Sequence, residues 1–271
     1  MENRTYHNTS SPYVLPNDID EVDRLNLQHY LFRFLLKGNS TAPVSHEIGR
    51  VLDVGCGSGI WSEEMSVEFA NAIFDLVDIS KVFHNTTNNP RLRFHEANTL
   101  KGLPFPDNTF DYSFQRLLVA GLTVYQWPTV VSEIARVTKP GGWVELVEND
   151  LYVFNSGPVM ARFRPWFFRA MAKKHIEPVA VRNIGSYLQE AGLVNVKLTK
   201  TIAPIGLAGG KLDELFLKDY LMVLSGMKSL ICKEAGISSA EFDSLLDEIE
   251  KECFEYESYG VIYVAYGQKP M

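Results

Sequence analysis

The sequence predicts an α/β fold in which a mostly parallel sheet lies between two layers of helices. Short apolar runs typical of strands alternate with helical patterns between residues 50 and 147, and this alternation indicates crossover units in a parallel sheet. A Gly-rich turn joins the first of these strands to the helix that follows it. Two further strand-like runs flank a helical region near the C-terminus. We therefore expect a three-layer, seven-stranded sheet that ends in an antiparallel hairpin.

The composition is that of an ordinary globular protein, with 271 residues of which 46% are hydrophobic and 22% charged. The net charge of −7 argues against nucleic acid or an anionic membrane as a partner. Three widely spaced cysteines without a CxxC pair argue against a disulfide framework or a zinc knuckle, and we expect no metal site. The sequence has no signal-peptide pattern and no apolar run of membrane-spanning length, which predicts a cytoplasmic location.

The N-terminal part should consist of a loose arm followed by one helix. Residues 1–16 are polar and rich in turn formers, which predicts a flexible arm. Asp18 and Glu21 have the spacing of a capping box, apolar residues follow at helical spacing, and Gly38 ends the run. Because no Pro-, Gly- or Ser-rich linker follows, we expect residues 17–271 to form a single domain. Its cofactor-binding core should span 46–150, and its substrate-side helices and final strands 151–271.

The remaining elements follow from apolar periodicity and from the positions of glycine and proline. In the core, we expect strands at 50–54, 73–79, 92–95, 110–114 and 143–147, and helices at 60–69 and 127–137. In the second half, we expect helices at 182–191, 211–232 and 238–253, and strands at 194–201 and 260–266. Residues 194–202 should pair near 260–266, with the helices between them forming an insertion.

The most informative motif is the Gly-rich turn in VLDVGCGSG, which contains Asp53, Gly55, Gly57 and Gly59. A turn from a strand into a helix presents free N–H groups, and glycine lets a ligand approach the backbone closely. Dinucleotide-binding turns have the spacing G-x-G-x-x-G, whereas the third glycine here comes one residue earlier. Asp53 would repel a pyrophosphate but would suit a ligand with an α-amino group and a sulfonium. The motif therefore favours S-adenosylmethionine over NAD, and a turn that binds nothing is the remaining alternative.

Asp78 is a second candidate, at the end of the second predicted strand and 19 residues after Gly59. An acid at this position can accept hydrogen bonds from both ribose hydroxyls of a nucleotide-like ligand. Asp75 is the rival acid, but strand alternation places the two side chains on different faces, and Asp78 is nearer the carboxyl end of the strand, where ligands bind. We therefore assign ribose binding to Asp78, with a solvated strand-end aspartate as the alternative.

Taken together, the segments VLDVGCGSG, VDIS, LPFPDNTFD and EIARVTKPGGWVEL resemble a class I, Rossmann-like, S-adenosylmethionine-dependent methyltransferase. The chain is more narrowly similar to the fungal LaeA-like methyltransferases, through YVLPNDIDEVDRLNLQHYLFRFLL, QRLLVAGL and the final YVAYGQKP. This narrower resemblance runs from about Tyr13 to Met271. It implies a methyl-transfer activity and a connection with secondary metabolism.

The resemblance also implies roles for individual residues. In such enzymes the acid and glycines of the first motif hold the methionine moiety, which corresponds to Asp53, Gly55, Gly57 and Gly59. Asp78 would bind the ribose, and Ile79 would lie beside the adenine. The adenine-binding position, usually Asp, is occupied by Asn98, with Thr99 next to it; an amide oxygen can still accept the bond but carries no charge. Gln115, just past the fourth predicted strand, would face the cofactor and substrate.

The sequence identifies no unambiguous general base, so the catalytic residue stays open. Methyl transfer from a sulfonium mainly needs an aligned nucleophile and exclusion of water. Polar residues near the carboxyl ends of the strands are Gln115, Arg116, Glu148, Asn149 and Asp150. Arg116 could position an anionic substrate or pair with a neighbouring carboxylate. His29 could cover the site, although a packed or surface histidine is the simpler interpretation, and FRPWFF at 163–168 favours core packing over a pocket wall.

Three functions are consistent with these observations. The first is methylation of a small-molecule acceptor, with helices near 156–180 and 211–254 forming the acceptor pocket. The second, implied by the LaeA-like resemblance, is regulation of secondary metabolism in a nuclear complex with a regulatory protein partner, where the target is a protein or methylation is incidental. The third is an NAD-dependent oxidoreductase, which the sequence disfavours because no Tyr-x-x-x-Lys set follows the nucleotide half.

Overall fold

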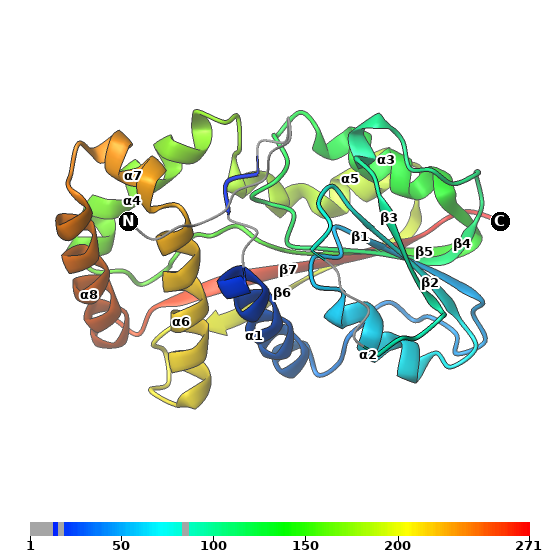
Figure 1. Cartoon of the computed structure of the whole chain (residues 1–271), viewed down its shortest axis with the longest axis horizontal. Coiled ribbons are helices and arrows are strands. Elements are labelled where there is room, and N and C mark those ends of the chain that lie inside the picture. The colour runs from blue at the N-terminus through cyan, green and yellow to red at the C-terminus, as the bar shows by residue number, and fades with distance from the viewer. Residues whose placement is uncertain (1–12, 16–18, 83–86) are drawn as a thin grey trace.

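The computed structural model describes residues 13–15, 19–82 and 87–271, which form one sheet and the helices around it (Figure 1). The strands are β1 (Arg50–Val54), β2 (Ile73–Asp78), β3 (Leu92–Glu96), β4 (Phe110–Arg116), β5 (Thr138–Asn149), β6 (Val194–Pro204) and β7 (Tyr259–Gln268). The α-helices are α1 (Ile19–Leu36), α2 (Ile60–Glu68), α3 (Trp127–Val137), α4 (Pro158–Ala172), α5 (Ile184–Glu190), α6 (Lys211–Gly226), α7 (Lys228–Ala235) and α8 (Ser239–Glu255). Two 3₁₀ segments are η1 (Thr99–Lys101) and η2 (Pro178–Asn183).

The sheet has seven strands in the order β3-β2-β1-β4-β5-β7-β6. Strands β1 to β5 pair in parallel, and β7 runs antiparallel to both β5 and β6. Helices α6 to α8 lie between β6 and β7 in the chain. The predicted parallel sheet, its antiparallel end and the helical insertion are therefore confirmed. The order reverses between β1 and β4, and this switch point is where open α/β sheets bind ligands, outside the carboxyl ends of the strands.

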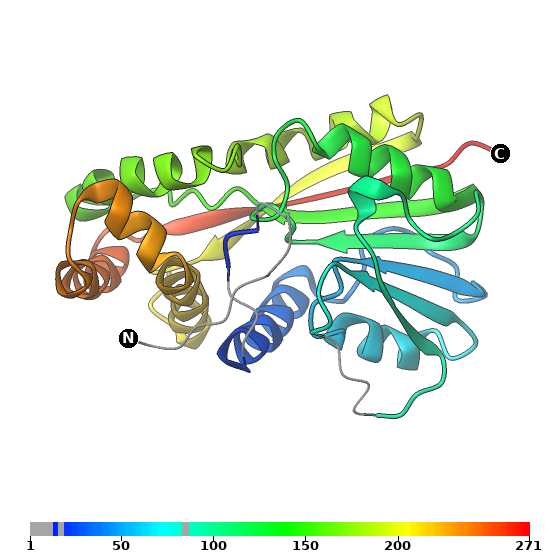
Figure 2. The same cartoon turned by 45° about the horizontal axis from the view of Figure 1, so that its top comes forward.

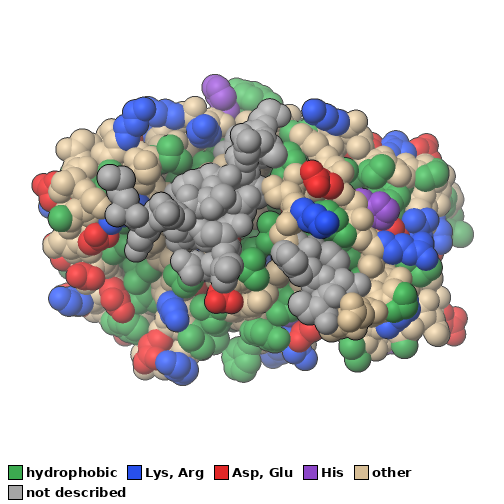
Figure 3. All heavy atoms as spheres, viewed as in Figure 1, with side chains coloured by type: hydrophobic (Ala, Val, Ile, Leu, Met, Phe, Trp, Pro, Cys, Tyr) green, Lys and Arg blue, Asp and Glu red, His purple; other side chains and the backbone are tan. Residues whose placement is uncertain are grey.

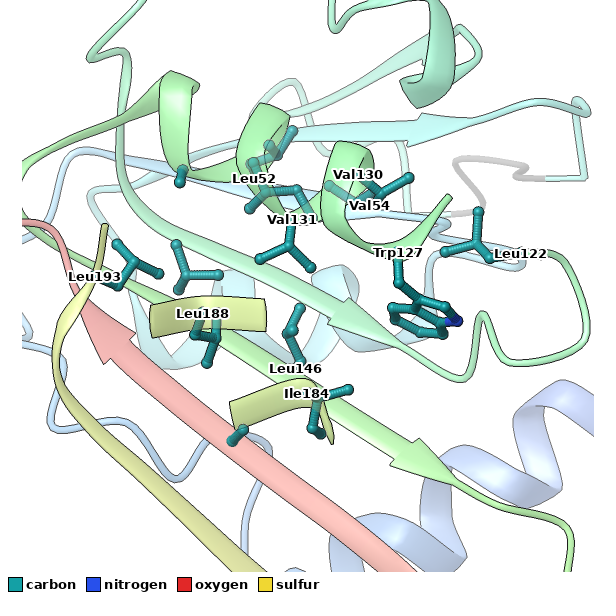
Figure 4. Packing of buried hydrophobic residues seen from close by; sticks show 14 of the residues in the cluster. Leu52, Val54, Leu122, Trp127, Val130, Val131, Leu146, Ile184, Leu188 and Leu193 are labelled. Atoms are coloured by element: carbon teal, nitrogen blue, oxygen red, sulfur yellow. The ribbon is translucent and has the colours of Figure 1, made fainter. Parts of the chain in front are cut away.

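Helices cover both faces of the sheet, as the turned view shows (Figure 2). On one face, α3 and α5 bury Trp127, Val131, Ile184 and Leu188 against strand residues such as Leu52 and Leu146 (Figure 4). On the other face, α1, α2 and α6 bury Phe32, Trp61 and Phe216 against Phe74 and Phe114. The central strands β1, β2 and β4 are mostly buried on both sides, as the near-continuous apolar runs of a parallel sheet require.

A second group of helices, α4, α6, α7 and α8, packs together at the end of the molecule opposite the C-terminus (Figure 1). Phe163, Phe167 and Phe242 are buried inside this group. The aromatic segment at 163–168 therefore serves core packing, which was the favoured interpretation. The Ser238/Glu241 capping box predicted at the start of α8 is present.

The predicted single helix at 211–232 is wrong, because the structure contains two helices that meet at Met227. Gly226 weakens the helix at this point, since glycine loses the most backbone entropy on ordering. The change of direction lets Leu224, Met227 and Ile231 all be buried in the same helical group. Packing thus favours a bend where the local pattern was continuous.

The first helix ends as predicted, but its beginning lies partly outside the described residues. The amide of Gly38 donates to the Arg33 carbonyl at 3.0 Å after the left-handed Lys37, which closes the helix. Asp18 is not among the described residues, so its capping role stays a prediction. Val14 and Leu15, which the sequence assigned to a loose arm, are buried, and the Val14 amide lies 3.3 Å from the Ala120 carbonyl.

The surface shows no concentration of one charge on the face seen in Figure 3, where basic and acidic side chains of the described residues are interspersed. Among the described residues, no helix is both long enough and apolar enough to cross a bilayer.

Candidate active site

A cavity of about 380 Å³ opens at the switch point between β1 and β4. Its size is in the range that binds a cofactor or a drug-sized molecule. The wall combines the β1–α2 turn, the end of β2, the start of η1, and the loop at 117–122. The wall is completed by Tyr13 and Leu15, which precede α1, by several residues of α1 itself, and by Val223 of α6. Segments from both ends of the chain therefore close over the carboxyl edge of the sheet.

The glycine turn forms one wall of this cavity, and two of its glycines line it. Gly55 and Gly57 have φ angles of +70° and +53°, the left-handed region that other residues rarely adopt. A Cβ atom at Gly55 would lie 2.6 Å from Cδ2 of Leu118, so the Leu118 side chain would have to move. Gly59, also left-handed, caps the start of α2 but does not line the cavity. The turn needs glycine both for its backbone and for the space beside Leu118.

Asp53 lies at the end of β1 with its side chain buried beside the cavity. Among the described residues, its carboxylate accepts one hydrogen bond, from the Ser62 hydroxyl at 2.7 Å. Burial raises the pKa of Asp53 to about 7, although the Ser62 bond and the positive charge of Arg116 act in the opposite direction. Because burial destabilises the charged form of this carboxylate, a cationic group in the cavity would stabilise it.

Asp78 also lines the cavity, whereas its rival Asp75 does not. Asp78 accepts hydrogen bonds from the amides of Gly57 and Ser80, both at 3.0 Å, so it joins the glycine turn to the end of β2. Asp75 is fully buried and pairs with Arg50 and His95, each at 2.7 Å. The two acids thus have different surroundings, and only Asp78 lies at the cavity.

Ile79, Asn98 and Thr99 line the cavity at the ends of β2 and β3. The Asn98 side-chain oxygen accepts from the Leu100 amide at 3.0 Å and caps η1. Because an amide oxygen has two lone pairs, it keeps the capacity to accept one further bond.

Gln115 differs from its predicted position. The fourth strand continues to Arg116, so Gln115 lies inside β4 rather than past its end. There it pairs with Val54 and Leu146, its side chain is fully buried, and it does not line the cavity. The apolar pattern stopped at Phe114, but backbone pairing with β5 extends the strand by two residues.

Arg116 is the last residue of β4, and its side chain lines the cavity and contacts α1. Its Nη2 atom donates to Nδ1 of His29 at 3.1 Å, and its guanidinium lies over the rings of Phe32 and Phe114 at 5.8 and 5.9 Å. Among the described residues, no carboxylate oxygen lies within 4.0 Å of it. The structure thus does not support the alternative that Arg116 pairs with a neighbouring carboxylate.

His29 is fully buried and holds Arg116 in place. Burial and the neighbouring Arg116 lower the pKa of His29 to about 4, so the ring is neutral near pH 7. Its Nε2 atom then donates to Glu64 at 2.8 Å, which leaves Nδ1 as the acceptor for Arg116. His29 is therefore a packed histidine, as favoured from the sequence. No periodic pattern in the chain indicates its contact with Arg116, 87 positions away.

The other polar candidates for catalysis lie behind the cavity wall. Glu148 is fully buried and accepts from the amides of Leu118 and Val119 at 2.9 and 3.1 Å, and burial raises its pKa to about 8. Asn149 accepts from the Leu151 amide, and Asp150 pairs with Arg182. None of these three side chains lines the cavity. Glu148 instead holds the backbone of the loop at 117–122, and this loop lines the cavity.

Sequence reasoning missed a buried ionic group on the α1 side of the cavity. Arg24 donates to both carboxylate oxygens of Glu21, at 3.0 and 2.7 Å, and to Asp219 of α6 at 2.9 Å. Gln28 donates to the second oxygen of Asp219 at 2.9 Å. Glu21, Arg24 and Gln28 line the cavity, so this group fastens α1 to α6 and gives the cavity a polar side.

Comparison with known proteins identifies the family. A family profile described as a methyltransferase domain matches residues 51–142. The N-methyltransferase sirN of Leptosphaeria maculans is 27% identical over 96% of this chain and 95% of its own length. The secondary metabolism regulator LAE1 of Cochliobolus heterostrophus is 30% identical over 75% of this chain and 70% of its own length. The chain belongs to the LaeA-like methyltransferases.

The fold of this methyltransferase agrees with that assignment. Phosphoethanolamine N-methyltransferase 2 of Haemonchus contortus, in complex with phosphomonomethylethanolamine and S-adenosylhomocysteine, aligns with a TM-score of 0.57 and 16% identity. The alignment covers 92% of this chain and 58% of that one. This methyltransferase is a class I, Rossmann-like enzyme that uses S-adenosylmethionine.

The cavity of the methyltransferase fits that cofactor. A buried carboxylate at Asp53 suits a cationic amino group, and Asp78 presents a second carboxylate one strand away. Gly55 packs so closely against Leu118 of the cavity wall that a Cβ atom there would displace the Leu118 side chain. Among the described residues, no group of three or more His, Cys, Asp or Glu side chains has the arrangement of a metal site.

Proposed function

We propose that this methyltransferase transfers a methyl group to a nitrogen atom of a small, largely apolar molecule. The observation that carries the proposal is the wall of the cavity outside the predicted donor residues, which is mostly apolar and comes from separate parts of the chain. Leu15, Leu118, Val119, Leu151 and Val223 all contribute to it. Such a wall buries a small apolar acceptor and excludes water.

In this proposal, the predicted residues hold the donor along the edge of the sheet. Asp53 binds its α-ammonium group, the backbone at Gly55 and Gly57 passes close to its methionine part, and Asp78 binds the ribose hydroxyls. Asn98 accepts from the adenine amino group, with Ile79 and Thr99 beside the ring. Gly59 acts only through the turn, and Gln115 is left without a direct contact because it does not line the cavity.

The reaction requires the protein to position the acceptor and the donor, and it requires no proton transfer by a side chain. When bound, S-adenosylmethionine supplies a methyl group activated by its sulfonium. A neutral nitrogen attacks with its lone pair, so the N–C bond forms as the S–C bond breaks, and the nitrogen proton is lost to water afterwards. The apolar wall holds the nitrogen in line and keeps competing water away. Glu21, Arg24 and Gln28 supply the polar contacts that orient the acceptor.

The nitrogen acceptor is supported by sirN, a relative that matches nearly the whole chain and is named an N-methyltransferase. The second candidate is a nuclear regulator that acts in a complex with a protein partner, supported by the 30% identity with a regulator of secondary metabolism.

The experiment is transfer of a radiolabelled methyl group from S-adenosylmethionine into an extract of the source cells, separated into small molecules and protein. We expect label in the small-molecule fraction, on a product whose methyl group is attached to nitrogen. The Gly55→Val variant is the matched control, because its side chain would collide with Leu118 and strain the left-handed backbone of the glycine turn, and it should abolish all labelling. Label that is confined to protein would overturn the proposal in favour of the regulator.

A further inference from the structure

Arg116 presents to the cavity a positive charge that has no salt-bridge partner among the described residues, on the same side as the buried carboxylate of Asp53. Both residues line the cavity at the ends of the neighbouring strands β4 and β1. Arg116 makes no ion pair with the described residues, and its hydrogen-bonding partner there is the neutral His29. A half-buried guanidinium with free donors at a ligand cavity is a site for an anion.

We propose that Arg116 binds the α-carboxylate of the methyl donor and so selects for an intact amino-acid end. The donor carries an ammonium and a carboxylate on the same carbon, and the cavity offers one carboxylate and one guanidinium beside the glycine turn. The two side chains are close enough for each to shift the pKa of the other, yet they do not form a salt bridge. A zwitterion between them would contact both charges at once.

The surroundings of Arg116 fix its direction. Nη2 is held by Nδ1 of His29, and the guanidinium rests on the faces of Phe32 and Phe114. His29 is in turn fixed by Glu64, which also accepts from Arg33 and Asn39. With one nitrogen held by His29, the remaining N–H groups of Arg116 are available to the ligand. His29 is thus a positioning residue for Arg116.

An anionic acceptor would also attract Arg116, so the test uses ligands that differ only in the amino-acid end. Calorimetry would measure binding of S-adenosylhomocysteine, of decarboxylated S-adenosylhomocysteine, which keeps the amino group and the thioether, and of 5′-methylthioadenosine, which lacks the amino-acid end altogether. We expect Arg116→Gln to lower the affinity for S-adenosylhomocysteine about 10- to 100-fold, which corresponds to the loss of one charge-assisted hydrogen bond. Binding of the two ligands without a carboxylate should change less than about twofold.

Arg33→Gln is the matched control, because Arg33 contacts the same Glu64 but is half exposed and does not line the cavity. It should leave all three affinities unchanged. His29→Ala should reproduce the selective loss for S-adenosylhomocysteine in weaker form.

The proposal is overturned if Arg116→Gln leaves the affinity for S-adenosylhomocysteine unchanged, or if it lowers the affinities for all three ligands equally. The inference rests on the donor placement proposed above, and 5′-methylthioadenosine tests that placement separately. If the wild-type protein binds 5′-methylthioadenosine, but Asp78→Ala does not weaken it, the donor placement fails rather than the assignment of Arg116.

Discussion

Replacing Gly55 by alanine tests the glycine turn, because the structure offers a control that separates backbone strain from lost space. Gly55 has a φ angle of +70°, and its Cβ position lies 2.6 Å from Cδ2 of Leu118. Gly236, after α7, has a φ angle of +69°, but no atom lies within 4 Å of its Cβ position. Gly236→Ala therefore introduces the same backbone strain without the contact.

The two variants should differ by the cost of the contact. Placing alanine in the left-handed region costs about 1–2 kcal/mol, and both variants should lose this much in free energy of unfolding. Displacing Leu118 from its packed position should cost Gly55→Ala about 1–3 kcal/mol more. Because Leu118 lines the cavity, the added methyl group should also weaken binding of S-adenosylhomocysteine, by about 10- to 200-fold, as for one methylene too many in a pocket.

The measurements are urea unfolding for stability and calorimetry for affinity, on both variants and the wild type. Gly236→Ala should bind with wild-type affinity. If Gly55→Ala loses no more stability than Gly236→Ala and binds the ligand equally well, Leu118 moves aside freely and the argument from close approach is refuted.

Three further predictions concern charge and packing. Because burial raises the pKa of Asp53 to about 7, affinity for S-adenosylhomocysteine should fall about tenfold per pH unit below pH 7, as the carboxylate must lose its proton to bind an ammonium group. Calorimetry between pH 5 and 8 should show this slope for the wild type, and a similar slope in Asp53→Asn would rule out Asp53 as its origin. The pKa of Glu148 is raised by burial to about 8, so its contribution to stability is full below its unfolded pKa of about 4.3 and is lost as the pH rises through 8. The free energy of unfolding in urea should thus fall more steeply from pH 5 to 8 in the wild type than in Glu148→Gln, and equal slopes would contradict this assignment. Phe167→Ala should cost about 3–5 kcal/mol of stability, since the ring is buried among α4 and its neighbours, while ligand affinity measured on the folded protein stays unchanged. Weakened ligand binding by the folded variant would show that this helical group shapes the cavity.

The sequence alone determined the fold class and the position of the Gly-rich turn with its preceding aspartate. Strand and helix periods are local properties, and the alternation through residues 50–147 allowed a parallel arrangement to be predicted. Asp53 and the left-handed glycines could be recognised because their spacing is set by one strand, one turn and one helix. The choice of Asp78 over Asp75 followed from strand alternation, which is also local, and the structure places only Asp78 at the cavity.

Tertiary packing decided which of the remaining polar residues face the cavity. Gln115 is buried because β4 extends by pairing with β5, and the helix predicted at 211–232 bends at Met227 because both halves bury side chains in one group. Arg116 depends on His29, 87 positions away, and Arg24 on Asp219, 195 positions away. Such contacts leave no periodic trace in a single sequence, because they arise only when distant segments meet. The glycine turn is therefore encoded locally. The positions of the Arg116 guanidinium and of the apolar wall beside it are set only when distant segments of the chain pack together.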